Sequence, residues 1–202
     1  MANPNTPYGL RPYSYQSGAP YNGAVRVYYV PSGNATALYI GDPVMIVTNS
    51  SDGNGVQTAE IATAGATNQV LGAFLGIANN AGQTTITLLQ SSTVYLPAST
   101  AAYIYVSDDP YLLYAIQEDS VGGSMVSGAS GRNADLVAGS GSTVTAQSGW
   151  MLDSSTLGTG NTKQLRIIQA LQETDNTVAT SFAKWLVKIN ATLHPFTNAL
   201  GT

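Results

Sequence analysis

The chain has 202 residues, which fits one domain, and its hydrophobic fraction of 44% is enough for a sizeable core. Only 9% of the residues are charged, against about 25% in an ordinary soluble domain. This composition excludes the usual kind of disordered chain, and the lack of Cys excludes disulfides and thiolate metal sites. A chain so poor in surface charge is typical of proteins that neighbours cover in an assembly.

Residues 1–23 are predicted to form an extended N-terminal arm. Four prolines in this segment remove backbone donors and fix φ, which excludes a helix and a central strand. Aromatic side chains between the prolines can bury large areas at low entropic cost. We therefore expect the arm to lie on a surface, either that of its own domain or that of a neighbour. The candidate interface residues are Tyr8, Leu10, Arg11, Tyr13, Tyr15 and Tyr21.

Residues 24–202 are predicted to form a single all-β domain, because short strands alternate with turns. The Ser-Asp-Gly-Asn-Gly stretch at 51–55 is a hairpin signal. Strands spaced by about ten residues are typical of a sandwich or barrel, and we expect a jelly-roll-like one. The expected strands up to residue 116 are 25–29, 44–48, 70–77, 84–89, 94–96, 102–106 and 111–116.

The second half of the chain opens with a long Gly/Ser-rich loop region near 120–162, a feature that is usually functional or flexible surface. A late strand then begins at Leu165. The segment 183–190 fits both a helical stripe and a strand, and its β-branched residues in an all-β setting favour the strand. We expect Ile167 and Trp185 to lie in the core.

Few groups in the sequence could carry catalysis. The single histidine, His194, precedes a proline, where a packing or exposed role is expected. The pair Asp108–Asp109 is explained as a turn that caps backbone amides, and Glu118–Asp119 ends a strand. Paired carboxylates can hydrolyse glycosides or bind calcium, but neither pair has the spacing of such a motif. The sequence therefore predicts no enzyme and no catalytic, cofactor-binding or metal-binding residues.

The net charge of −4 is distributed unevenly along the chain. Residues 1–41 carry two Arg and no acid, whereas residues 42–162 carry nine acids against one Arg. Residues 163–202 carry four cations against two acids. An acidic body argues against direct nucleic-acid binding, which needs clustered Lys and Arg. Basic ends would suit docking on an acidic partner surface.

Several stretches resemble a family of phage structural proteins, the cement or decoration proteins of short-tailed bacteriophages. Each stretch is weakly specific, but together they span nearly the whole chain. They are 3–12 (NPNTPYGLRP), 18–24 (GAPYNGA), 28–35 (YYVPSGNA), 41–44 (GDPV), 108–110 (DDP), 116–119 (IQED), 132–136 (RNADL), 148–153 (SGWMLD), 175–176 (DN) and 183–190 (AKWLVKIN).

The resemblance implies a jelly-roll-like domain on the outer capsid surface, often as a dimer, which bridges copies of the major capsid protein. It implies no catalytic residues. We therefore expect a virion protein made in the bacterial host cytoplasm, with neither a nucleic-acid nor a membrane partner. The alternatives are a tail or minor head structural protein and a carbohydrate-binding β module, which would show a surface groove lined by Tyr.

Overall fold

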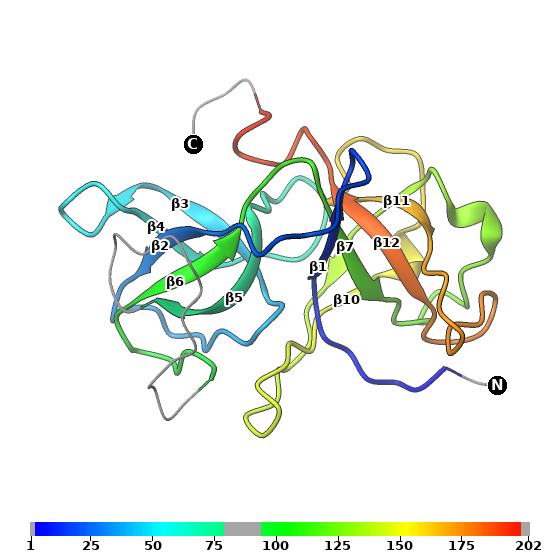
Figure 1. Cartoon of the computed structure of the whole chain (residues 1–202), viewed down its shortest axis with the longest axis horizontal. Coiled ribbons are helices and arrows are strands. Elements are labelled where there is room, and N and C mark those ends of the chain that lie inside the picture. The colour runs from blue at the N-terminus through cyan, green and yellow to red at the C-terminus, as the bar shows by residue number, and fades with distance from the viewer. Residues whose placement is uncertain (1–2, 79–93, 199–202) are drawn as a thin grey trace.

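The computed structural model describes residues 3–78 and 94–198, and nearly all of its regular structure is β (Figure 1). The all-β prediction is therefore confirmed. The strands are β1 (Arg11–Tyr15), β2 (Arg26–Val30), β3 (Pro43–Ser51), β4 (Gln57–Ile61), β5 (Gly72–Ala78), β6 (Ala102–Ser107), β7 (Leu112–Gln117), β8 (Asn133–Ala134), β9 (Leu136–Val137), β10 (Met151–Leu152), β11 (Leu165–Ala170) and β12 (Lys184–Ile189). Short 3-10 turns lie at η1 (Ser127–Ala129) and η2 (Ser154–Thr156).

Five strands between residues 26 and 107 close into a barrel in the order β2-β4-β3-β5-β6, the left lobe of Figure 1. Alternation of side chains along each strand fills its interior, as Val44 and Ile46 of β3 and Phe74 of β5 show. The residues between them, such as Met45 and Ala73, point outward and pack in a second cluster with the other lobe. Period-two sequence patterns thus build both the barrel core and the contact between lobes.

The right lobe is a five-stranded antiparallel sheet in the order β1-β7-β12-β11-β8. Its inner face supplies Tyr114, Ile167 and Trp185 to the cluster shared with the barrel. The prediction that Ile167 and Trp185 lie in the core is confirmed, since both are fully buried. The shorter β9–β10 ladder adds Leu136 and Leu152 to the same cluster.

The N-terminal arm lies along its own sheet. Residues 11–15 form the edge strand β1, which pairs with β7 through a bulge between Pro12 and Ser14. Prolines are tolerated there because an edge strand needs only one of its sides for pairing. Ahead of the strand, Gln117 of β7 receives the Thr6 amide at 3.1 Å and donates to the Pro4 carbonyl at 2.8 Å.

Other predicted elements agree with the structure within a few residues. The strands expected at 25–29, 44–48, 70–77, 102–106 and 111–116 correspond to β2, β3, β5, β6 and β7, and the 51–55 hairpin joins β3 to β4. The ambiguous segment 183–190 is the strand β12. Residues 94–96 contribute one isolated bridge, Leu38 to Leu96. The strand expected at 84–89 lies outside the described residues.

The Gly/Ser-rich region 120–162 is more structured than the prediction of long loops implied. It contains β8, β9 and β10 and both 3-10 turns. Between β9 and β10 the chain forms a protruding loop, whose tip residue Val144 is 93% exposed. Across the described ranges, no helix has the length and apolar character needed to cross a membrane.

Candidate functional site

The two ends of the chain, far apart in sequence, build one surface on the five-stranded sheet. We call it the outer face, because it lies opposite the face that packs toward the barrel. In β12, Lys184, Leu186 and Lys188 point to this face, whereas Trp185 and Val187 point inward. Strand pairing places Arg166 of β11 beside Lys188, on the same face. It also places Arg11 of β1 beside Ala115 of β7. Ala115 packs with Leu186 in a small cluster on the outer face, so Arg11 lies on that face too. Four of the seven cations of the chain thus meet here.

Most of these cations are not neutralised by carboxylates. Lys184 is the exception, since its Nζ lies 2.9 Å from Glu173 and 2.8 Å from Asp175. Lys188 instead donates to Gln16 Oε1 at 2.9 Å and lies 5.0 Å from the centre of an aromatic ring, that of Tyr111. Across residues 3–78 and 94–198, neither Arg11 nor Arg166 has a carboxylate partner.

The outer face is therefore the basic part of an acidic molecule. Its four cations against two acids give +2, whereas the remaining three cations against nine acids give −6. The basic N-terminal and C-terminal segments were recognisable in the sequence, but their meeting was not. It depends on β1 pairing with β7, about a hundred residues away.

The predicted interface residues divide between core and surface. Leu10 is fully buried in the main core cluster, so its prediction as an interface residue is wrong. Tyr8 packs on the outer cluster, burial raises its pKa to about 12, and Arg11 lies 4.5 Å from its ring centre. Tyr13 is 50% exposed.

Two further tyrosines of the arm pack mainly within the chain. Tyr15 and Tyr21 lie against the main core cluster, with their ring centres 6.3 Å apart. Of the six predicted residues, Arg11 and Tyr13 are the exposed ones.

The acidic pairs have structural partners. Asp109 accepts the Tyr111 amide at 2.7 Å, which confirms a capped turn. Asp108 is buried, accepts the Tyr28 hydroxyl at 2.7 Å and lies 3.2 Å from Arg26. Burial raises the pKa of the Asp108 carboxyl, and the hydrogen bond from the Tyr28 hydroxyl offsets part of that rise.

Two other titratable residues, Glu118 and His194, are also buried. Glu118 is fully buried and accepts the Met125 amide at 3.0 Å, and burial raises the pKa of its carboxyl. His194 is 1% exposed, and burial lowers its pKa to about 4, which keeps the ring neutral. Its Nδ1 accepts the Phe196 amide at 3.2 Å, so His194 has the expected packing role.

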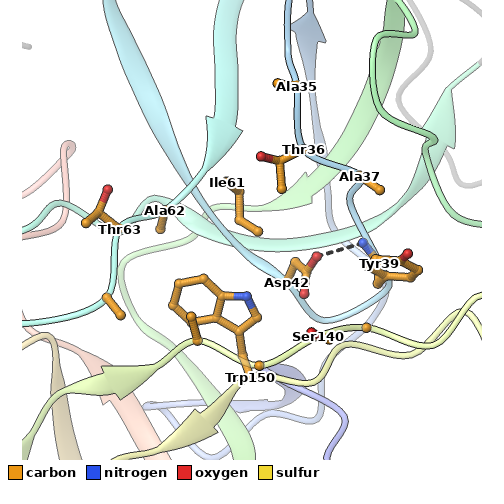
Figure 2. A pocket seen from close by; sticks show the side chains of 14 residues that line it. Ala35, Thr36, Ala37, Tyr39, Asp42, Ile61, Ala62, Thr63, Ser140 and Trp150 are labelled. Atoms are coloured by element: carbon orange, nitrogen blue, oxygen red, sulfur yellow. Dashed lines mark hydrogen bonds between the residues drawn. The ribbon is translucent and has the colours of Figure 1, made fainter.

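A cleft of about 710 Å³ opens between the barrel and the loop that connects β9 to β10 (Figure 2). Asp42 points into it, and the indole of Trp150 lies across one side with its nitrogen-bearing edge toward Asp42. One carboxylate oxygen of Asp42 accepts the Tyr39 amide at 2.7 Å. The lining residues are Ala35, Thr36, Ala37, Tyr39, Asp42, Ile61, Ala62, Thr63, Ala64, Ala138, Gly139, Ser140, Gly141 and Trp150.

Burial raises the pKa of Asp42 to about 6, against the opposing effects of the Ser148 hydroxyl and the Tyr39 amide. No sequence pattern marked Asp42 as a site, because Gly-Asp-Pro at 41–43 is an ordinary turn signal. Asp42 becomes part of a cleft wall because residues 138–141 and Trp150, which are distant in sequence, lie around the same space.

No family model, curated protein or solved structure matches this chain.

Proposed function

We propose that this chain is a structural virion protein of a tailed phage, which binds the outer surface of the capsid and bridges major capsid protein subunits to stabilise the shell. The observation that carries the proposal is the basic outer face, where the arm and the late strands gather four of the seven cations. The resemblance of the sequence to phage cement proteins indicates that the partner of this surface is the major capsid protein.

Complementary charge would orient the protein on an acidic patch of the shell. Exposed Arg11 and Arg166 supply charge, and Tyr13 and Ile168 add exposed apolar area at the bulges of the same two strands. Arg and Tyr are both enriched at protein interfaces. Electrostatic complementarity contributes to association rate and specificity, while the apolar contacts provide area. The arm is already paired with the sheet through β1 and β7, so docking requires no folding of a disordered segment.

Stabilisation would arise from repetition over a closed shell. Each copy needs only a modest interface, because a protein that bridges two subunits, or self-associates as a dimer on the capsid, binds its second site at high effective concentration. Many such bridges together would resist the internal pressure of packaged DNA. This mechanism uses no catalytic group.

Thermal rupture of capsids tests the proposal. Capsids that lack this protein should release DNA at a lower temperature, and purified protein should restore the rupture temperature. Arg166→Gln should weaken restoration, and higher salt should do the same because exposed charges are screened within about 10 Å at 0.1 M salt. Arg132→Gln, a matched loss of charge outside the outer face, should restore fully. Identical rupture with and without the protein would reject the cement function and favour a tail or minor head role.

One observation favours the carbohydrate-binding alternative. Tyr15 and Tyr111 line a shallow hollow of about 470 Å³ beside Gln16, and Tyr111 is 58% exposed. Aromatic rings beside amide groups suit sugar recognition. A Tyr111→Ala variant that loses binding to host-surface glycans but still restores capsids would add this role to the proposed one. Glycan binding that is absent from the unaltered protein would reject it.

A further inference from the structure

A hollow on the outer face lies where the N-terminal arm, β12 and the loop between β9 and β10 meet, and we call it the arm pocket. Its volume is about 440 Å³. It is lined by two cations and several neutral polar side chains, without a carboxylate, which indicates a site for an anion. The lining residues are Thr6, Pro7, Tyr8, Arg11, Thr145, Gln147 and Lys184.

Strand pairing brings the walls of the arm pocket together. Gln117 of β7 lies beside Lys184 of β12 and accepts the Thr6 amide at 3.1 Å, which holds the arm next to Lys184. Arg11 begins β1, and its guanidinium carbon lies 4.5 Å from the centre of the Tyr8 ring. The loop between β9 and β10 supplies the remaining wall. The fold therefore sets the shape of the pocket.

The donors of the arm pocket are open to solvent and largely unused. Arg11 is exposed, and within residues 3–78 and 94–198 its guanidinium has neither a carboxylate partner nor a hydrogen bond. A cation over an aromatic ring needs no hydrogen bond, so the five N–H donors of Arg11 remain available. Thr6 and Thr145 are exposed as well. A ligand can therefore reach the groups on which its binding would depend.

The charge of the arm pocket indicates which anion fits. Lys184 is already balanced by Glu173 and Asp175, which lie 2.9 and 2.8 Å from its Nζ and outside the lining. Among the described residues that line the pocket, Arg11 is thus the one cation without a counter-charge. A carboxylate carries a single charge and accepts two parallel N–H bonds from a guanidinium. A phosphate group carries about 1.5 to 2 negative charges at pH 7, and the two neighbouring acids would repel the excess.

We propose that the arm pocket binds the carboxylate of an acidic side chain, Asp or Glu, on a partner protein, with that carboxylate on the guanidinium of Arg11. The hydroxyls of Thr6 and Thr145 can donate to the oxygen lone pairs that Arg11 leaves free. The chemistry of the pocket stands independently of the shell function. The identity of the partner rests on the proposed function, under which the acidic side chain belongs to the major capsid protein.

A free carboxylate analogue tests the pocket directly. The probe is Nα-acetyl-glutamate N-methylamide, and its matched control is the glutamine analogue, which has the same shape without the charge. Titrations at constant ionic strength are followed by NMR of the isotope-labelled protein. The glutamate probe should move the signals of the Arg11 Nε–H and the Gln147 side-chain amide along a saturable curve. The glutamine probe should leave them in place, and inorganic phosphate should bind no more tightly than the glutamate probe.

Variants identify the group responsible. Arg11→Gln, followed at Gln147, should weaken the glutamate probe about tenfold or more, the usual effect of losing charge-assisted hydrogen bonds. Arg166→Gln removes the same charge from the same face, but β11 lies three strand spacings from β1, about 14 Å. Charges are screened within about 10 Å at 0.1 M salt, so this control should lose less than about twofold. Glu173→Gln removes a repelling charge and should strengthen the probe roughly twofold.

A further variant tests the pocket with Arg11 intact. Thr145→Asp places a carboxylate at the exposed rim and should also weaken the glutamate probe, because it competes for the guanidinium and repels the ligand. The proposal would be overturned by the lack of a saturable shift, equal binding of the glutamine probe, or tighter binding of phosphate. Equal losses in Arg11→Gln and Arg166→Gln, or unchanged affinity in both pocket variants, would overturn it too. None of these results depends on capsids, so failure here is distinct from failure of the cement function.

Discussion

At the scale of single residues, Trp185 is the strongest test of the core. It is fully buried in β12 within the cluster that joins the sheet to the barrel. Trp185→Ala should lower the free energy of unfolding by about 3–5 kcal/mol, the range for large aromatics removed from packed sites. Trp185→Phe keeps most of the ring and should cost less. Denaturant unfolding measures both, with the exposed Val144→Ala as a control expected within about 0.5 kcal/mol. A loss below about 1 kcal/mol for Trp185→Ala would contradict its core role.

Asp42 gives a second residue-scale prediction, on pH dependence. Its pKa rises from 3.8 to about 6 on folding because burial disfavours the charged form. The folded state therefore binds the proton more tightly than the unfolded state, and the stability this provides is lost as pH rises from about 4 through 6. Two pKa units correspond to a free energy on the order of 3 kcal/mol.

The Asp42→Asn variant isolates this effect from that of other groups. Its Oδ1 can still accept the Tyr39 amide, but it has no charge to desolvate. The difference in unfolding free energy, variant minus unaltered protein, should therefore increase between pH 4 and pH 7. Urea titrations at several pH values measure it. His194, whose pKa falls to about 4, acts with the opposite sign in both proteins and cancels in the difference. A difference independent of pH would contradict the raised pKa of Asp42.

At the scale of elements, the sequence predicted strands wherever the signal was local. Alternation located β2, apolar stretches set off by turns located β3, β6 and β7, and β-branched residues resolved 183–190 as β12. The strand β1 was missed because the prolines within and around it argue against pairing. Its partner β7, which stabilises it nonetheless, is remote in sequence. The same reason explains Leu10: an arm of Pro and Tyr gives no periodicity that would mark one of its residues as core.

The candidate sites, like the strands, were predictable only where the sequence signal was local. Charge along the chain predicted basic ends, and the structure adds that they share one sheet face. The cleft had no sequence signal, because the residues that line it come from four separate segments of common turn and strand residues. Sites of this kind depend on tertiary contacts between loops, which local patterns do not encode.

Strand β5 supplies a prediction about close packing in the barrel. A Cβ added at Gly72 would lie 1.9 Å from the Ser107 carbonyl oxygen, so the backbones of β5 and β6 are too close for a side chain. Gly72→Ala should destabilise the protein by about 1–3 kcal/mol or more, the cost of forcing atoms into a packed core. Gly33→Ala is the control, because nothing lies within 4 Å of the added carbon. Thermal melts of both variants measure the difference. Equal melting temperatures would show that β5 can shift freely.

At the scale of the whole molecule, the two lobes in Figure 1 share one hydrophobic cluster. Ala62, Val70 and Ala73 come from the barrel side, and they pack with the inner face of the five-stranded sheet. Neither lobe can separate without exposing this apolar surface to water, at about 25 cal/mol per Å². A continuous core of this kind favours unfolding as one cooperative unit.

We therefore predict a single unfolding transition that is the same by every probe. Tryptophan fluorescence reports the shared cluster, since Trp150 and Trp185 both belong to it, whereas far-UV circular dichroism reports strands of both lobes. The two curves should coincide in urea. Ile104→Ala, a change in the interior of the barrel, should move both curves by the same amount, because destabilising one lobe destabilises the whole. If the dichroism curve became biphasic while the tryptophan curve stayed in place, the lobes would be independent units and residues 24–202 would not form a single domain.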